Sequence, residues 1–132
     1  MVDVTGHIIV ADVGSATPHD SVGGKILLEK LLVIKDISCL KTILADGAYS
    51  GELQEWFHRV TKGKRIEIAK KSKEKGFHVI AKRWIVERTF AWFGHFRRLS
   101  KDYEHTPKSS LTHLFIADTI LLIKKITKPT IP

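Results

Sequence analysis

The sequence predicts an α/β fold built around one hydrophobic core. Short apolar or alternating runs, which favour strands, are separated by longer stretches whose apolar residues recur at helical spacing. Their order is strand, strand, helix, strand, helix, strand, helix, helix, which is an α/β pattern. A chain of 132 residues, 43% of them apolar, is long enough for one globular domain and marginal for two.

The first third of the chain predicts a hairpin followed by a helix. Residues 2–4 and the β-rich residues 7–13 are separated by Thr5-Gly6, which is typical of a tight turn. Asp20 or Ser21 can then cap a helix over residues 22–33, where leucine and isoleucine recur on one broad face.

The middle third predicts two strands around a helix. Residues 42–45 form an unbroken apolar run before Asp46-Gly47, which indicates a buried, parallel strand with Asp46 at its carboxyl end. Ser50 is expected to cap a helix that runs to Val60, and the alternating residues 65–69 predict another strand.

The stretch over residues 82–98 predicts a helix with apolar side chains around most of its circumference, as expected of a helix buried on more than one side. Arg83, Glu87, Ala91, Gly94 and Arg98 share one face at helical spacing. The two small residues leave that face open to close approach. The spacing of Arg83 and Glu87 also suits a simple structural ion pair on a packed helix.

The final helix is expected to start at Ser109 or Ser110. We expect one domain over residues 1–126 and a disordered tail over residues 127–132.

The net charge of +8 is unevenly distributed. Residues 1–50 carry 4 Lys/Arg against 6 Asp/Glu, whereas residues 51–105 carry 14 against 7. Positive charge beside isolated carboxylates suits a protein that handles phosphodiesters, although a solvated basic surface that aids solubility fits equally well. The single cysteine excludes an internal disulfide, and no apolar run approaches a membrane span, so we expect a cytoplasmic protein.

Asp46 and Glu87 are the candidate metal ligands. Carboxylate oxygens suit Mg²⁺ or Mn²⁺ rather than zinc, and the carboxyl ends of parallel strands are where ligands gather in open α/β sheets. An Asp-Gly pair after a strand is also a common turn signal, so the turn alone explains Asp46 equally simply.

Two longer blocks of sequence carry a family resemblance. Residues 44–51 (LADGAYSG) and 83–92 (RWIVERTFAW), followed by residues 97–104 (RRLSKDYE), resemble the DDE-type transposases of bacterial insertion sequences, in the insertion-sequence-five branch. The resemblance covers nearly the whole chain and corresponds to the C-terminal part of the catalytic domain.

This resemblance implies an RNase H-like catalytic core that cleaves and transfers DNA strands with Mg²⁺. It makes Asp46 and Glu87 catalytic metal ligands and Arg83 the arginine of the family's Tyr-Arg-Glu signature. The family's first aspartate lies on a strand upstream of the segment that Met1 opens, so we expect an N-terminally truncated core whose first strand is missing. Such a chain is a truncated copy or a second reading frame, inactive alone and dependent on a full-length transposase or an upstream-frame partner.

The expected DNA contacts are basic residues near the two carboxylates: Lys70, Lys71, Lys73, Lys75, Arg88, Arg97 and Arg98. Two alternatives stay open at this stage. The chain can be a basic, non-catalytic module that binds DNA and regulates a full-length transposase, or a decayed gene product without activity.

Overall fold

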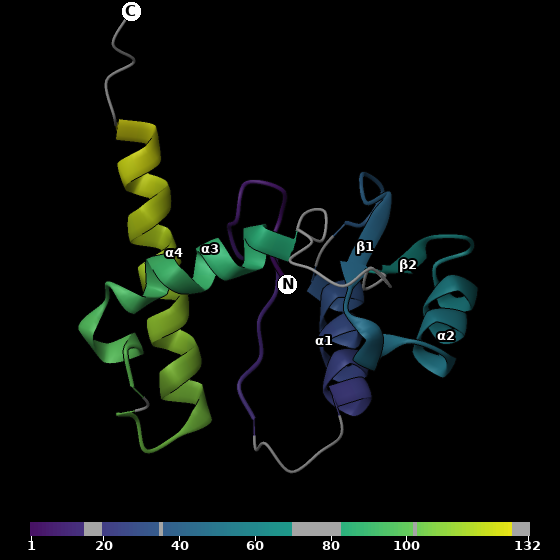
Figure 1. Ribbon diagram of the computed structural model, residues 1–132, viewed down its shortest axis with the longest axis horizontal. Helices are drawn as coiled ribbons and strands as arrows, with labels where there is room; N and C mark the ends of the chain where they lie inside the picture. Colours follow the sequence, from purple (N-terminus) through teal and green to yellow (C-terminus); the bar gives the residue numbers. More distant parts are fainter. Residues whose placement is uncertain (15–19, 35, 70–82, 102, 128–132) are drawn as a thin grey trace, which may run out of the picture. The chain divides into compact units, whose positions relative to one another are not determined.

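The computed structural model describes residues 1–14, 20–34, 36–69, 83–101 and 103–127 (Figure 1). Four of the expected DNA contacts (Lys70, Lys71, Lys73 and Lys75) and the part of the predicted tail beyond Thr127 lie outside the described residues. The chain's contacts group it into two compact units, which we describe separately: unit one comprises residues 1–13 and 85–132, and unit two comprises residues 14–84.

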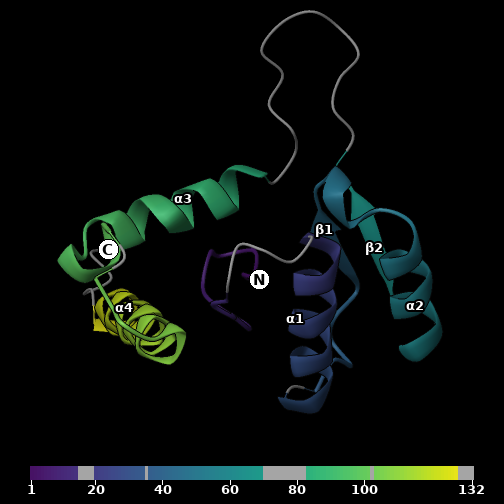
Figure 2. The ribbon, with the colours of Figure 1, turned by 90° about the horizontal axis from the view of Figure 1, so that it is seen from below.

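Unit two is a small α/β unit in which two parallel strands pack with two helices. Thr42 lies opposite Arg65 and Ala45 opposite Ile68 in the parallel ladder, which is visible in Figure 2. Helix α2 contacts both β2 and α1. The elements are α1 (Asp20–Ile34), β1 (Thr42–Ala45), the 3₁₀ turn η1 (Gly47–Tyr49), α2 (Glu52–Val60) and β2 (Arg65–Ile68).

The core of unit two comes from the apolar faces that the sequence spacing predicts. Its buried side chains include Leu28, Leu31, Leu53, Phe57 and Ile66. Leu53 and Phe57 are one helical turn apart, so they point from the same side of α2. Burial of these side chains is the main favourable term that holds the unit together.

Two predictions for unit two are wrong in detail. Strand β1 is not fully buried, because residues alternate between exposed and half-buried positions and Leu44 is 45% exposed. Ser50 does not cap α2, since its hydroxyl donates to Gly47 O in the preceding turn. The helix instead starts after Gly51, whose φ of +85° favours glycine and whose N–H donates to the Gln54 side chain at 3.1 Å.

Unit one combines residues 1–13 with α3 (Arg83–Gly94) from Ile85 onwards, η2 (Arg97–Leu99) and α4 (Pro107–Thr127). The predicted hairpin is reduced to a single antiparallel bridge between Val2 and Ile8, around a turn at Gly6. Backbone bonds from Asp3 N to His7 O and from Ile9 N to Met1 O close this hairpin.

Helix α3 is shorter and more exposed than the sequence indicates. It ends at Gly94, because the amides of His95 and Phe96 bond three residues back and tighten the last turn. Arg98 therefore lies in η2 and does not continue the stripe of Glu87. Trp84 is 48% and Phe90 67% exposed, so the helix does not bury most of its circumference.

Helix α4 starts at Pro107, two or three residues earlier than the predicted start at Ser109 or Ser110. Thr106 is its cap, with its hydroxyl oxygen accepting from Ser109 N at 3.2 Å, and Pro107 occupies the first turn, where its missing N–H costs nothing. Within the described residues, no helix combines the length and apolar character that a membrane span requires.

Candidate functional site

Asp46 lies where the sequence places it, immediately after β1. Its Oδ1 accepts a hydrogen bond from Ala48 N at 3.0 Å, and its backbone oxygen accepts from Tyr49 N at 3.2 Å. The residue therefore caps η1, as the turn interpretation predicts, and its side chain is still exposed to solvent. A carboxylate fixed in this way can face a ligand, because only Oδ1 is engaged by the turn.

Glu87 lies on the exposed side of α3. Ile85, Thr89 and Phe93 are buried on the other side of the helix. Glu87 itself is exposed, as are its neighbour Val86 and Phe90 one turn later. The carboxylate therefore projects from the face of α3 that unit one leaves open.

Asp46 belongs to unit two and Glu87 to unit one. Their pairing in one metal site stays a prediction, as does the pairing of Glu87 with Arg83 one turn earlier. Across the described part of the chain, no group of three or more His, Cys, Asp or Glu side chains is gathered as a metal site.

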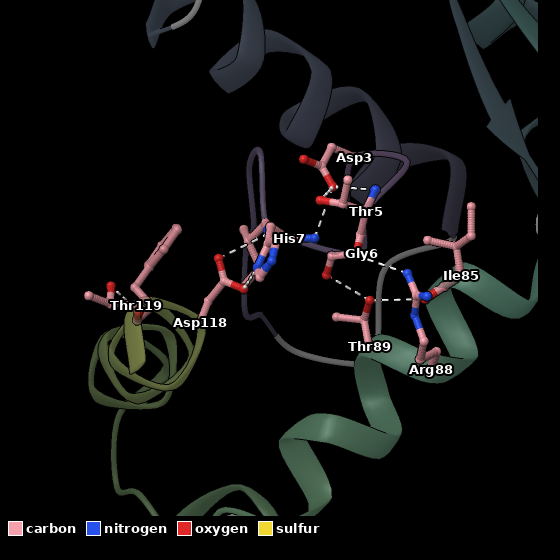
Figure 3. Close-up of polar contacts among 11 residues, drawn as sticks. Asp3, Thr5, Gly6, His7, Ile85, Arg88, Thr89, Asp118 and Thr119 are labelled. Carbon is pink, nitrogen blue, oxygen red and sulfur yellow. Dashed lines mark hydrogen bonds and ion pairs between the residues drawn. The ribbon is translucent and has the colours of Figure 1, made fainter. Parts of the chain in front are cut away.

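The helix that carries Glu87 is held from its buried side by the N-terminal hairpin (Figure 3). Thr89 Oγ1 lies 2.8 Å from Gly6 O and 2.9 Å from Ile85 O, and its proton can be donated to either. Arg88 Nη2 donates to Thr5 O at 2.9 Å. Two adjacent residues of α3 thus bond the carbonyls of the hairpin turn, which fixes the rotation of the helix.

A buried acidic residue joins the same hairpin to α4. Asp118 is 4% exposed, and its Oδ1 lies 3.1 Å from Nδ1 of His7, which is 7% exposed. Its Oδ2 accepts from Ile8 N at 3.1 Å. Sequence reasoning missed Asp118; the available signal was a single carboxylate next to Ala117 on the apolar face of the last helix. Buried charges are costly unless they are paired, so such a residue predicts a partner.

Arg88, predicted to bind DNA, is engaged within unit one. Its guanidinium carbon lies 4.7 Å from the centre of the Trp92 ring, in addition to the bond to Thr5 O. The His7 ring lies 6.1 Å from the same indole. Contact between Arg88 and DNA remains a prediction, but the structure also gives this side chain a role in packing the hairpin.

Arg98 is partly neutralised by Glu104. Its Nη1 lies 2.7 Å from Glu104 Oε1, which also lies 3.2 Å from His113 Nε2. The Ser109 hydroxyl donates to the other carboxylate oxygen. That bond, followed by the one from Arg98, lowers the pKa of Glu104 below its ordinary value. Arg97, the adjacent candidate for DNA contact, is exposed.

The carboxylate of Asp3 holds the N-terminal hairpin turn together. Its Oδ1 accepts from Thr5 N and Thr5 Oγ1, both at 2.8 Å, and from His7 N at 3.0 Å. Burial raises the pKa of Asp3, but these hydrogen bonds outweigh burial and leave that pKa below its ordinary value. Three donors on one oxygen identify Asp3 as a turn-forming residue.

Comparison with known proteins identifies the family. Residues 1–118 match the family described as "Transposase DDE domain", so the chain belongs to the DDE transposase domain family. The resemblance of the two acidic blocks to insertion-sequence transposases is thereby confirmed.

One curated relative adds detail to the family match. The chain is 39% identical over 66 residues to the protein named "Putative transposase for insertion sequence element IS402" of Burkholderia cepacia. The match covers 48% of this chain and 30% of that relative. No solved structure matches the chain significantly.

Replacement of Gly6 by alanine is expected to loosen the hairpin from α3. Gly6 has a φ of +92°, and an added Cβ would lie 3.0 Å from Thr89 Oγ1 and 3.1 Å from Trp92 Cζ3. We expect a loss of about 1–3 kcal/mol in the free energy of unfolding, together with a change in Trp92 fluorescence in a variant whose other two tryptophans are phenylalanine.

Gly14→Ala is the matched control, because an added Cβ there meets nothing within 4 Å. Its effect on unfolding should stay within about 0.5 kcal/mol. Equal stability of the Gly6 and Gly14 variants would contradict the assigned hairpin contact.

Acid is expected to weaken unit one through Glu104. Because the pKa of Glu104 is lowered on folding, its contribution to stability is present above its ordinary pKa of 4.5 and is lost as the pH falls through the lowered value. Ser109→Ala should raise this pKa towards 4.5, as measured by the pH titration of the Glu104 carboxyl carbon by NMR. Ser100→Ala, whose hydroxyl bonds Arg97 O, is the control and should leave the titration unchanged.

Proposed function

We propose that this chain is part of a transposase catalytic domain that cleaves and transfers DNA strands with a divalent metal ion. The observation that carries the proposal is the exposure of Asp46 and Glu87 at the places where the family resemblance puts its second and third acidic ligands. An RNase H-like core is the fold proposed for the complete domain. The two parallel strands and flanking helices of unit two are compatible with it.

The donor chemistry of these two residues suits Mg²⁺ or Mn²⁺, since both supply hard carboxylate oxygens that are exposed. When bound, such an ion would activate the attacking hydroxyl and stabilise the leaving oxygen in phosphodiester chemistry. The chain's own contribution is to orient the carboxylates: η1 fixes Asp46, and the hairpin fixes the rotation of the helix behind Glu87.

The basic residues supply the proposed DNA contact. Arg97 is exposed beside Arg98, and the sequence adds Lys70, Lys71, Lys73 and Lys75. Such cations would offset backbone phosphates without reading bases, so the contact should be salt-dependent and largely independent of sequence.

Complete activity is proposed to need more polypeptide than these 132 residues. The chain spans about 30% of the length of its IS402 relative, and by resemblance the first acidic ligand comes from an upstream strand. We expect the 132-residue chain to cleave DNA only with a protein that supplies this aspartate. Metal-dependent cleavage by the purified chain alone, lost in Asp46→Asn, would refute this expectation.

Millimolar Mn²⁺ is expected to stabilise the wild-type chain against thermal unfolding. A ligand present at about 100 times its dissociation constant contributes about 2.7 kcal/mol. Asp46→Asn and Glu87→Gln should each reduce the shift, whereas Glu52→Gln, an exposed acid on α2, should not. A cooperative melt that Mn²⁺ does not alter would count against the metal site and favour the non-catalytic DNA-binding module.

Replacement of the four lysines 70, 71, 73 and 75 by glutamine is expected to weaken DNA binding and its salt dependence. Each lost phosphate contact should lower the slope of log affinity against log salt by about 0.9 on duplex DNA. Fluorescence anisotropy between about 50 and 200 mM salt measures this slope. Lys124→Gln with Lys125→Gln, in the last turn of α4, is the control. An unchanged slope in the fourfold variant would remove the lysine run from the interface.

A further inference from the structure

Tyr49 lies unusually close to the backbone of α1. A Cβ added to Gly24 would lie only 2.7 Å from both Cδ1 and Cε1 of the Tyr49 ring, and 3.2 Å from Leu53 Cδ2. Real side chains essentially never approach so closely, so the ring occupies the space that any other residue at position 24 would fill. Gly23, its neighbour in the same helix, has nothing within 4 Å of the corresponding position.

The same tyrosine belongs to the turn that fixes Asp46. η1 consists of three residues, and Asp46 caps it through bonds from Ala48 N to Oδ1 and from Tyr49 N to the backbone oxygen. The ring at one end of the turn and the carboxylate at the other are thus parts of one short, hydrogen-bonded segment. A displacement of the ring that carries the Tyr49 backbone with it also moves the segment to which Asp46 is bonded.

The electrostatics of Tyr49 agree with this placement. Burial raises the pKa of its phenol, and the negative charges of Asp20 and Asp46 raise that pKa further. Both carboxylates are therefore near enough to act on the phenol. Asp20 is the first residue of α1, the helix that also carries Gly24.

We propose that Tyr49 is a positioning residue for Asp46: its ring, seated against Gly24, fixes η1 and thereby the direction of the Asp46 carboxylate. The packing of the ring carries this role, and the hydroxyl is not required. What the carboxylate does once positioned rests on the proposed function, so the test reads its position and its metal binding separately.

The first measurement is made without metal, on the full 132-residue chain. The amide of Ala48 donates to Asp46 Oδ1, so its proton should exchange slowly with deuterated solvent; this protection, followed by NMR, is the Ala48 response. Gly24→Ala should abolish this response and Gly23→Ala should retain it. The two variants add the same methyl group to the same helix and raise its helix propensity alike. Thermal unfolding of both variants therefore shows whether a lost Ala48 response comes from a general loss of fold or from the contact with Tyr49.

The second set of variants separates ring from hydroxyl. Tyr49→Phe keeps the ring and should preserve the Ala48 response, whereas Tyr49→Ala should lose it. In the Tyr49→Ala background, the change Gly24→Ala should have little further effect, because the two ring atoms at 2.7 Å are gone and only Leu53 Cδ2, at 3.2 Å, remains near the added methyl group. A Phe variant that behaves like the Ala variant, or a Gly24→Ala variant that behaves like Gly23→Ala, would overturn the proposal.

The third measurement titrates Mn²⁺ and follows the free ion by electron paramagnetic resonance. If Asp46→Asn weakens binding, Gly24→Ala and Tyr49→Ala should raise the dissociation constant about tenfold, as residues that orient metal ligands typically do; Gly23→Ala and Tyr49→Phe should not. Binding that ignores Asp46 would refute the proposed metal site, while the Ala48 response still decides the positioning role. If Mn²⁺ binding depends on Asp46 but is unchanged in Gly24→Ala, the positioning role of Tyr49 is overturned and the proposed metal site stands.

Discussion

Unit one depends on the close approach of the Gly6 turn to helix α3. The Thr89 hydroxyl reaches Gly6 O at 2.8 Å, and the same turn offers Thr5 O to Arg88. This approach needs a residue without a side chain at position 6, since a Cβ would enter the contact distances of three α3 side chains. The hairpin is otherwise closed by few backbone bonds, so its docking on the helix is what gives it a defined conformation.

The buried pair of His7 and Asp118 extends this docking to α4. Buried polar pairs are weak sources of net stability, because the desolvation of both groups offsets their attraction. They are, however, selective: a slipped hairpin would leave the Asp118 carboxylate buried without its bonds to His7 and Ile8 N. The pair therefore favours one register of the hairpin over the shifted registers. Because the hairpin bonds α3, the pair also favours one rotation of that helix.

Both candidate ligands follow the same arrangement: the carboxylate is exposed, and a residue close to it in sequence packs against another part of the same unit. Glu87 is exposed while Thr89, two residues later, is 3% exposed and bonded to the hairpin. Asp46 is exposed while Tyr49, three residues later, packs on Gly24. A carboxylate in water costs little to maintain, and the packed neighbour limits the directions that it samples. The proposed function needs this arrangement, because a site that admits a DNA phosphate must be exposed and still hold its ligands in place.

Local sequence patterns were enough to predict the type and order of most elements. Helical spacing predicted α1, α2, α3 and α4, and the apolar run before Asp46 predicted β1 and its parallel pairing, because these signals are local. The blocks around Asp46 and Glu87 were also sufficient to identify the family.

The side chains that support Asp46 and Glu87 could be identified only from the three-dimensional packing. The end of α3 at Gly94, the burial of Asp118 against His7 and the contact between Tyr49 and Gly24 join residues that are distant in sequence or depend on the course of the backbone. Periodicity reports which face of an element is apolar. It does not report what packs on that face, because the partner is set by distances between elements that no local pattern contains.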